Sequence, residues 1–239
     1  MQKNEVLPFV VCHMLTSLDG KIDGAYISDP VCRPALTAYG QLRGYYDCQA
    51  TLYGTVTMLG SYSDGLAPEL SDAESLPRED YLAPNDVTNF IVSVDPKGTL
   101  GFDSGYIEKK GRPRAHVVEV LSQQVSDGYL SYLREKGVSY IFAGDGNLDC
   151  ALILKKLKSK FGIERLMIAG GGYMNYSFLY EGLIDELSWV IAPLADGNTH
   201  SVSSFERSDF LSEKVSAFSL IEAKPLDGDA LWLRYQRKV

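Results

Sequence analysis

Cysteine and histidine are scarce in this sequence, with four cysteines and three histidines among 239 residues. The cysteines form no C-x-x-C pair, and the two residue types nowhere combine at the spacing of metal ligands. We therefore expect neither a zinc site nor a disulfide framework, but reduced thiols and no bound metal. The residues concerned are Cys12, Cys32, Cys48, Cys150, His13, His116 and His200.

Long apolar runs and an excess of basic residues are also missing. No run approaches the ~20 residues that a helix needs to cross a bilayer, and the polar start Met1–Glu5 lacks the layout of a signal peptide. Lysine and arginine number 23 against 31 acidic residues, so the formal net charge is −8. Such a chain has no overall attraction to nucleic acid or to an anionic membrane. We expect a cytoplasmic protein whose partner is a small molecule, and neither nucleic acid nor a membrane.

The composition that remains is that of a globular protein, with 45% hydrophobic and 23% charged residues. No internal repeat, linker or shift in composition divides the chain, so we predict a single domain over residues 1–239. The periodicity of apolar residues predicts alternating strands and helices. The strands are predicted at 9–14, 50–53, 88–94, 115–120, 138–143, 165–169 and 186–193, and the helices at 34–48, 126–136, 149–161 and 173–181.

This alternation favours a three-layer α/β fold with a mostly parallel central sheet. Two late segments, 214–224 and 229–238, flank Asp227-Gly228 and predict a hairpin, which makes the C-terminal edge of the sheet antiparallel. Residues 60–85 show no clear period. A loop of this length in a compact domain is more often functional or mobile than inert.

The best-defined helix is the one predicted at 149–161. Asp149 is placed to cap its N-terminus, and Gly162 can adopt the left-handed conformation that ends a helix. An apolar stripe should be buried and a run of lysines should face water. The stripe is Ile153, Leu154, Leu157 and Phe161, and the lysines are Lys155, Lys156, Lys158 and Lys160.

Two junctions between a strand and a helix carry glycine, Gly54-Thr-Val-Thr57 and Gly170-Gly-Gly172. In parallel α/β sheets, ligands gather at the carboxyl ends of strands, where helix N-termini present free N–H groups and glycine lets a phosphate approach. Either junction alone could be a tight turn, because neither has the G-x-G-x-x-G or the phosphate-loop pattern. Two such junctions in one sheet favour a nucleotide with an extended phosphate.

The segment Ser17-Leu-Asp-Gly-Lys21 allows a plain structural interpretation. Asp-Gly between apolar flanks is an ordinary turn, in which Lys21 is simply exposed. His13, in the preceding strand, is better explained as a core histidine than as a catalyst. No Ser-His-Asp or Cys-His set has supporting context, which disfavours nucleophilic hydrolysis.

Read in order, three groups of motifs resemble a known family. The first is Ser17-Leu-Asp-Gly-Lys21, the second is Leu42-Arg43 with Gly54-x-x-Thr57, and the third is Ile168-Ala-Gly-Gly-Gly-Tyr173 with Phe178-Leu-x-x-Gly-Leu-Ile-Asp-Glu-Leu187 and Ile191-Ala-Pro193. They resemble the riboflavin-biosynthesis pyrimidine reductases, the C-terminal reductase domain of the bifunctional deaminase-reductases. The resemblance covers nearly the whole chain and implies a dihydrofolate-reductase-like fold.

The resemblance also implies NADPH and a hydride transfer that reduces the sugar carbon of an aminouracil ribosyl phosphate. Asp19 and Lys21 would lie beside the nicotinamide and the substrate, as the catalytic residues. The residues implied for the cofactor are Gly54 and Thr57 along its length, Ser93 and Lys97 at the adenosine 2′-phosphate, and Gly170, Gly171, Gly172 and Tyr173 at the pyrophosphate. The cofactor supplies the hydride, and the protein fixes distance, angle and charge.

Differences from the family pattern fall on the substrate side. Ala169 stands where biosynthetic members usually carry Glu, the segment 22–28 is short, and the usual Asp-x-Pro is missing around 61–66. Two alternatives therefore stay open: a reductase of the same fold for a pterin, folate, carbonyl or imine, and a non-catalytic nucleotide-binding protein.

The family is usually dimeric, and the predicted edge of the sheet is apolar. Trp189, Trp232 and Leu233 lie in the strand 186–193 and the hairpin 214–238. Because an apolar edge is normally covered in a soluble protein, we predict a homodimer.

Overall fold

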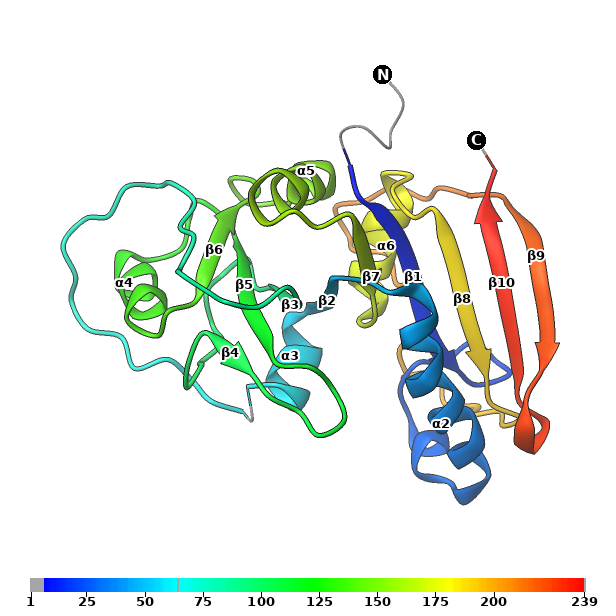
Figure 1. Cartoon of the computed structure of the whole chain (residues 1–239). Coiled ribbons are helices and arrows are strands. Elements are labelled where there is room, and N and C mark those ends of the chain that lie inside the picture. The colour runs from blue at the N-terminus through cyan, green and yellow to red at the C-terminus, as the bar shows by residue number, and fades with distance from the viewer. Residues whose placement is uncertain (1–6, 64, 239) are drawn as a thin grey trace. The chain divides into compact units, whose positions relative to one another are not determined.

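The computed structural model describes residues 7–63 and 65–238, so the start of the chain used above, Met1–Glu5, lies outside the described residues (Figure 1). Two compact units are present. The first is Gln49–Glu164 with the N-terminal segment up to Pro8, and the second combines Phe9–Cys48 with Arg165–Val239. That the two units fold as one domain stays a prediction.

The first unit has a parallel set of strands at its centre. β5 (Ala115–Leu121) pairs in parallel with β3 (Phe90–Val94) and β6 (Ser139–Phe142), and β3 pairs in parallel with β2 (Ala50–Gly54). Every residue of β3, β5 and β6 is buried, as expected for parallel strands covered on both faces. The short β4 (Tyr106–Ile107) pairs antiparallel with β5 and was not predicted, because two residues carry no period.

The helices of the first unit end where the sequence predicts. In α5 (Cys150–Phe161), the Asp149 side chain accepts a hydrogen bond from the backbone N–H of Leu152 at 2.7 Å, and Gly162 is left-handed at φ 68°. The α4 helix (Asp127–Glu135) is capped by Ser126 in the same way. The remaining helix, α3 (Thr55–Ser61), follows β2 directly.

The lysine face of α5 does not simply meet water, which corrects the prediction for this helix. Lys156 Nζ lies 2.8 Å from Asp80 Oδ1, and Lys160 Nζ lies 3.3 Å from Asp80 Oδ2. Lys158 Nζ lies 2.8 Å from Glu164. The carboxylate of Asp80 is only 7% exposed, so two ammonium groups compensate its charge.

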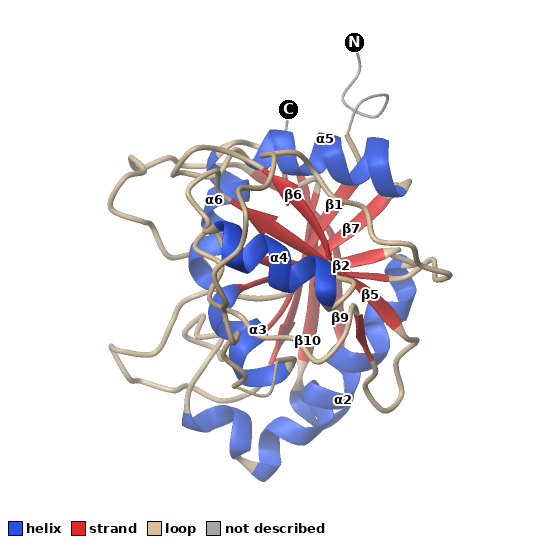
Figure 2. Ribbon diagram, turned by 90° about the vertical axis from the view of Figure 1, so that its left-hand side faces the viewer, coloured by secondary structure: helices blue, strands red, loops and turns tan. Residues whose placement is uncertain are grey.

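Asp80 belongs to the long loop, drawn tan in Figure 2, which has no helix or regular strand between Gly65 and Asn89. The loop lies along β6, since Tyr81 and Tyr140 exchange two backbone hydrogen bonds of 2.9 Å. The backbone N–H of Ala83 also donates to Ser139 Oγ at 2.9 Å. The loop is therefore tied to the strand at its side.

The second unit contains the antiparallel edge. β1 (Phe9–Thr16) pairs in parallel with β7 (Arg165–Ile168) and β8 (Glu186–Ile191). β10 (Leu231–Arg237) pairs antiparallel with β8 and with β9 (Phe218–Pro225), the outer strand of the hairpin (Figure 1). The mostly parallel α/β fold with antiparallel C-terminal strands is thus confirmed.

The helix predicted at 34–48 is shorter in the structure. The α-helix α2 spans Arg33–Leu42 and continues as a 3-10 helix, η3 (Arg43–Tyr46), before Asp47 turns left-handed at φ 45°. Two glycines, Gly40 and Gly44, weaken a regular helix at this end. The other helices of the unit are η1 (Ala25–Ser28), η2 (Pro30–Cys32), α6 (Gly172–Tyr180) and η4 (Asp227–Asp229).

His13 is a core residue, as predicted. It is fully buried, with Nδ1 2.8 Å from Ser188 Oγ and Nε2 3.0 Å from the carbonyl of Tyr39. Trp232 Nε1 donates to the same Ser188 oxygen at 2.9 Å, which leaves the serine hydrogen for His13 Nδ1. Burial lowers the pKa of His13 to about 4, so the ring is neutral and structural.

A buried ion pair lies on the neighbouring strands. The guanidinium of Arg234 contacts both carboxylate oxygens of Glu186, at 2.7 and 3.2 Å, and Tyr46 donates its hydroxyl to the same carboxylate at 2.6 Å. The two charged side chains are 14% and 9% exposed. A bidentate pair with a third hydrogen bond satisfies both charges.

Candidate active site

The first candidate residues lie on a tight turn that follows β1. Ser17 Oγ donates to Asp19 Oδ1 at 2.5 Å and accepts from the backbone N–H of Lys21 at 2.9 Å. The backbone of the turn is closed by Ser17 N–H donating to the carbonyl of Lys21, and Gly20 takes φ +77°. Ser17, itself buried, therefore fixes the positions of both candidates.

Asp19 is held by its own chain. Besides Ser17, its carboxylate accepts the backbone N–H groups of Asp196 and Gly197, at 3.0 and 2.9 Å. These hydrogen bonds hold the pKa of the exposed Asp19 carboxyl well below its usual range. Asp19 is therefore ionised at neutral pH and anchors the chain after β8, and it has no proton to donate.

Lys21 is half-buried and bonded. Its Nζ donates to the carbonyl of Ser201 at 2.9 Å and to Ser203 Oγ at 3.4 Å, and its backbone forms an antiparallel bridge with Ser203. The interpretation of Lys21 as a merely exposed turn lysine is therefore not supported. Its ammonium is fixed in place.

The glycines before α6 have different roles. Gly171 is the N-cap at φ 84°, where a side chain is strained, and a Cβ there would have only Met174 Cβ within 4 Å, at 3.8 Å. A Cβ at Gly172 would instead collide with the carbonyl of Ser203 and lie 2.7 Å from Glu206 Cγ. The close approach at Gly172 is thus made by the protein itself, whereas Gly171 faces open space. Tyr173 is exposed in the first turn of α6.

Segment 201–206 joins these two places, and nothing in the sequence indicated it. Ser204 donates from its backbone N–H to the carbonyl of Gly20 at 3.0 Å, and Glu206 donates in the same way to the carbonyl of Gly172 at 3.0 Å. Asn175, buried in α6, donates to the carbonyl of Ser204 at 2.8 Å. A serine-rich stretch without a period is an unremarkable loop in sequence, so only the structure reveals its position.

The first unit brings a second group of candidates together. Gly54 is the N-cap of α3 with an extended backbone, φ −82°, so its conformation does not require glycine. Thr55 Oγ1 donates to the carbonyl of Val94 at 2.9 Å, which connects this junction to the end of β3. Thr57 is half-buried in the first turns of α3.

The turn after β3 presents Lys97. The buried carboxylate of Asp95 accepts the backbone N–H groups of Thr99 at 2.5 Å and Leu100 at 2.9 Å, and the Gly98 N–H closes the turn on the Asp95 carbonyl. Lys97 is exposed on this rigid turn. Its charge is available to an anion.

Ser93 differs from Lys97 in exposure, and its contact with the adenosine 2′-phosphate stays a prediction. It is fully buried, in register with Glu119 of β5, so its hydroxyl faces the interior. Burial, and secondarily the nearby Asp95 carboxylate, raise the pKa of Glu119 well above its ordinary value.

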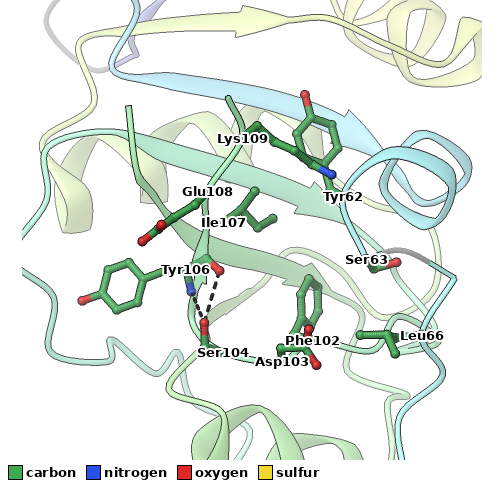
Figure 3. A pocket seen from close by; sticks show the side chains of 10 residues that line it. All are labelled: Tyr62, Ser63, Leu66, Phe102, Asp103, Ser104, Tyr106, Ile107, Glu108 and Lys109. Carbon is green, nitrogen blue, oxygen red and sulfur yellow. Dashed lines mark hydrogen bonds between the residues drawn. The ribbon is translucent and has the colours of Figure 1, made fainter. Parts of the chain in front are cut away.

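A pocket of about 160 Å³ also opens in the first unit, and none of the predicted site residues lines it (Figure 3). Figure 3 shows Lys109 beside the ring of Tyr62, and Ser104 hydrogen-bonded to the backbone of Tyr106. The lining residues are Tyr62, Ser63, Leu66, Phe102, Asp103, Ser104, Tyr106, Ile107, Glu108 and Lys109.

Residues 7–63 and 65–238 contain neither a metal site nor a membrane-spanning helix. In this part of the chain, no group of three or more His, Cys, Asp and Glu side chains could hold a metal ion. No helix within it has the length and apolar character to pass through a membrane.

Each unit thus carries its candidates at the carboxyl ends of parallel strands, β1 and β7 in one and β2 and β3 in the other. This placement is typical of α/β proteins, in which small ligands bind beyond the carboxyl ends of the strands. The chain belongs to the family described as the RibD C-terminal domain, whose model matches residues 8–231.

Comparison with known proteins gives the same family. A curated relative, the 2,5-diamino-6-ribosylamino-4(3H)-pyrimidinone 5′-phosphate reductase of Methanothermobacter thermautotrophicus, is 28% identical over 191 residues, 80% of each chain. A pyrimidine reductase-like protein of Corynebacterium diphtheriae has the same fold, with a TM-score of 0.69 and 17% identity over 99% of this chain and 94% of that one.

Two further solved structures share the fold. The riboflavin biosynthesis reductase of Saccharomyces cerevisiae gives a TM-score of 0.61 at 17% identity, over 100% of this chain and 93% of that one. RibD of Acinetobacter baumannii gives 0.65 at 18% identity over 97% of this chain, which spans only 58% of RibD.

Proposed function

We propose that this protein is an NADPH-dependent reductase of riboflavin biosynthesis, acting on the sugar of a ribosylaminopyrimidine phosphate. The observation that carries the proposal is the family match over residues 8–231. The curated relative named as a reductase of such a compound supports the substrate class. A reductase of this type takes its hydride from a nicotinamide cofactor, which supplies the reducing equivalents when bound.

The residues present fit such a cofactor. Within the described residues no side chain caps α6, and the space beside Gly171 is open, so its first-turn N–H groups suit a pyrophosphate. Exposed Lys97 suits the 2′-phosphate that distinguishes NADPH. We assign the cofactor to Gly54, Thr57, Lys97, Gly170, Gly171, Gly172 and Tyr173.

The chain's own residues would orient the substrate. The Lys21 ammonium is fixed by Ser201 and Ser203 and can donate to a substrate oxygen. Asp19 acts through the chain that it anchors, because an ionised carboxylate cannot supply the proton. We therefore propose Lys21 as a substrate-contacting residue and Asp19 as a positioning residue.

The test is NADPH oxidation with three substrates: the ribosylaminopyrimidine phosphate, dihydrofolate and a simple carbonyl compound. We expect turnover with the first alone, and Gly171→Val should weaken NADPH binding by roughly tenfold or more, because its side chain takes the space of a phosphate. Tight NADPH binding without turnover of any substrate would favour the non-catalytic alternative. Unchanged NADPH affinity in folded Gly171→Val would remove α6 from the cofactor site.

A reductase of another substrate is the second candidate, and Ala169 favours it. This residue is buried, 6% exposed, at the position where the resemblance expects Glu. Replacing it by Glu should raise turnover of the ribosylaminopyrimidine only if that compound offers a partner to the new carboxylate, since an unpaired buried charge is costly.

We further propose a cytoplasmic homodimer that pairs along the outer strand β9. Trp232, predicted to be part of an exposed apolar edge, is buried in its own unit at 3% exposure, and Trp189 and Leu233 are half-buried. Leu220 and Ile221 of β9 are 56% and 46% exposed and take their place. Light scattering should give twice the chain mass of 26.4 kDa. A monomeric mass at micromolar concentration would contradict the dimer.

A further inference from the structure

We propose that Ser203 and Glu206 contact the substrate together with Lys21, and that these three side chains recognise an uncharged group bearing both a carbonyl and an amino function. The inference rests on the proposed reductase function and deepens it. It assigns the heterocycle, and not the phosphate, to this part of the second unit.

Segment 201–206 is firmly positioned, which a binding site requires. Its backbone is bonded at one end to the turn that carries Lys21, through Ile22 N–H to the Val202 carbonyl at 2.9 Å. At its other end, Glu206 is bonded to Gly172. The Phe205 ring stacks on Trp189 at 5.6 Å between centroids. The side chains of the segment are therefore held between two elements of the same unit.

Two hydrogen-bond donors remain at one place. An ammonium has three hydrogens, and Lys21 uses one on the Ser201 carbonyl and one on Ser203 Oγ. Because Ser203 Oγ accepts from Lys21, its own hydroxyl hydrogen points elsewhere. Within the described chain, one ammonium hydrogen and the Ser203 hydroxyl hydrogen are thus left for an acceptor from outside, such as a carbonyl oxygen.

An acceptor lies beside these donors. Glu206 Oε1 takes the backbone N–H of Ser203 at 2.7 Å, which fixes the carboxylate next to that residue. Glu206 is half-buried, and no cation pairs with it among the described residues. Its second oxygen retains lone pairs that suit an amino group.

The local charge argues against phosphate as the group bound here. The turn and the connecting chain carry one ammonium, that of Lys21, and three carboxylates, those of Asp19, Asp196 and Glu206. Asp196 accepts a hydrogen bond from the Ser201 hydroxyl at 2.6 Å. A formal charge of −2 repels a phosphate dianion, whereas a neutral heterocycle keeps the hydrogen bonds without the repulsion.

The experiment compares wild type, Ser203→Ala, Ser203→Thr and Glu206→Gln in steady-state kinetics with the ribosylaminopyrimidine phosphate. Exposed Ser159→Ala and Glu74→Gln are the matched controls, which we expect to behave as wild type. Each hydrogen bond lost should raise KM by roughly 3- to 10-fold with kcat little changed. Ser203→Thr keeps the hydroxyl and should restore KM. NADPH affinity and Tm should stay the same. If the segment had only a structural role, the substitutions would change Tm or NADPH affinity instead of KM.

Inorganic phosphate, used as a competitor, tests the assignment to the heterocycle. Its inhibition constant should be the same in wild type and Ser203→Ala. A weaker inhibition in the variant would show that the phosphate binds here and would overturn the inference. If the wild type turns over the substrate and KM is unchanged in both Ser203→Ala and Glu206→Gln, the inference is overturned but the proposed function is not. Absence of turnover in wild type would instead overturn the proposed function and, with it, the inference.

Discussion

The candidate residues of the two units are supported in different ways. In the second unit, the Lys21 side chain and the Asp19 carboxylate are both bonded to chain that lies some 180 residues further on, at Ser201 and Asp196. In the first unit, Lys97 is exposed on a turn whose backbone is fixed by the Asp95 carboxylate. The difference suits different tasks. In the roles proposed for them, a side chain that orients a substrate needs an exact position, whereas a surface charge that attracts an anion needs only to be present.

The largest expected effect concerns the stability of the second unit. Arg234→Met would leave the Glu186 carboxylate buried without its cation and should lower the free energy of unfolding by about 3–5 kcal/mol. Chemical denaturation of the variant and of the double variant Arg234→Met/Glu186→Leu measures it. The double variant should recover most of the loss. Similar stability of wild type and single variant would show that this ion pair does not hold the unit.

In the first unit, the free energy of unfolding should depend on pH through Glu119. The pKa of Glu119 is raised in the folded chain, so above about pH 4.5 only the unfolded chain releases this proton and folding stability falls. The free energy of unfolding then falls by up to about 1.4 kcal/mol per pH unit, until the pH reaches the pKa of Glu119 in the folded chain. Glu119→Gln should remove this fall, measured as the free energy of unfolding between pH 4 and pH 8. The same slope in variant and wild type would assign the fall to other groups.

Lys21→Met tests the positioned cation. Loss of a charge-assisted hydrogen bond should lower kcat/KM by an amount equivalent to about 1–3 kcal/mol, with NADPH affinity and Tm nearly unchanged. Steady-state kinetics and calorimetric titration with NADPH separate these quantities. An unaltered kcat/KM in Lys21→Met would show that Lys21 does not contact the substrate and has only a structural role.

Lys97→Ala should have the smallest effect. An exposed ion pair contributes about 0.2–1 kcal/mol, so NADPH affinity should fall two- to fivefold while NADH affinity, without the 2′-phosphate, stays the same. Titrations at low and high salt provide the check, because screening should reduce the difference. An equal loss of affinity for NADPH and NADH would show that Lys97 does not contact the 2′-phosphate.

Local patterns made most of the fold predictable. The Asp149 cap and the Gly162 end of α5 involve residues a few positions apart, so sequence alone defines them. The pairing of Asp80 with Lys156 joins positions 76 residues apart and leaves no periodic trace. The same holds for segment 201–206, whose contacts with Gly20 and Gly172 arise only once the chain has folded.

The site was predictable where the motifs themselves form it. The turn 17–21 and the junction 170–173 lie where their spacing indicated, after β1 and β7. The burial of Ser93 was not predictable, because a residue near a strand end can face either way, and here it lies in register with Glu119. A family pattern places a residue along the chain, while the alternation of strand side chains decides whether it reaches solvent.

The order of the units along the chain has a consequence for synthesis. Residues Gln49–Glu164 are continuous, whereas the second unit is begun by β1 and completed only by β7, β8 and the C-terminal hairpin. At ~5–20 residues per second, the ribosome needs of order ten seconds to make the intervening chain. During that time the apolar strand β1 has none of its neighbouring strands, so the nascent chain should bind chaperones from β1 onward and release them only after β8 has emerged.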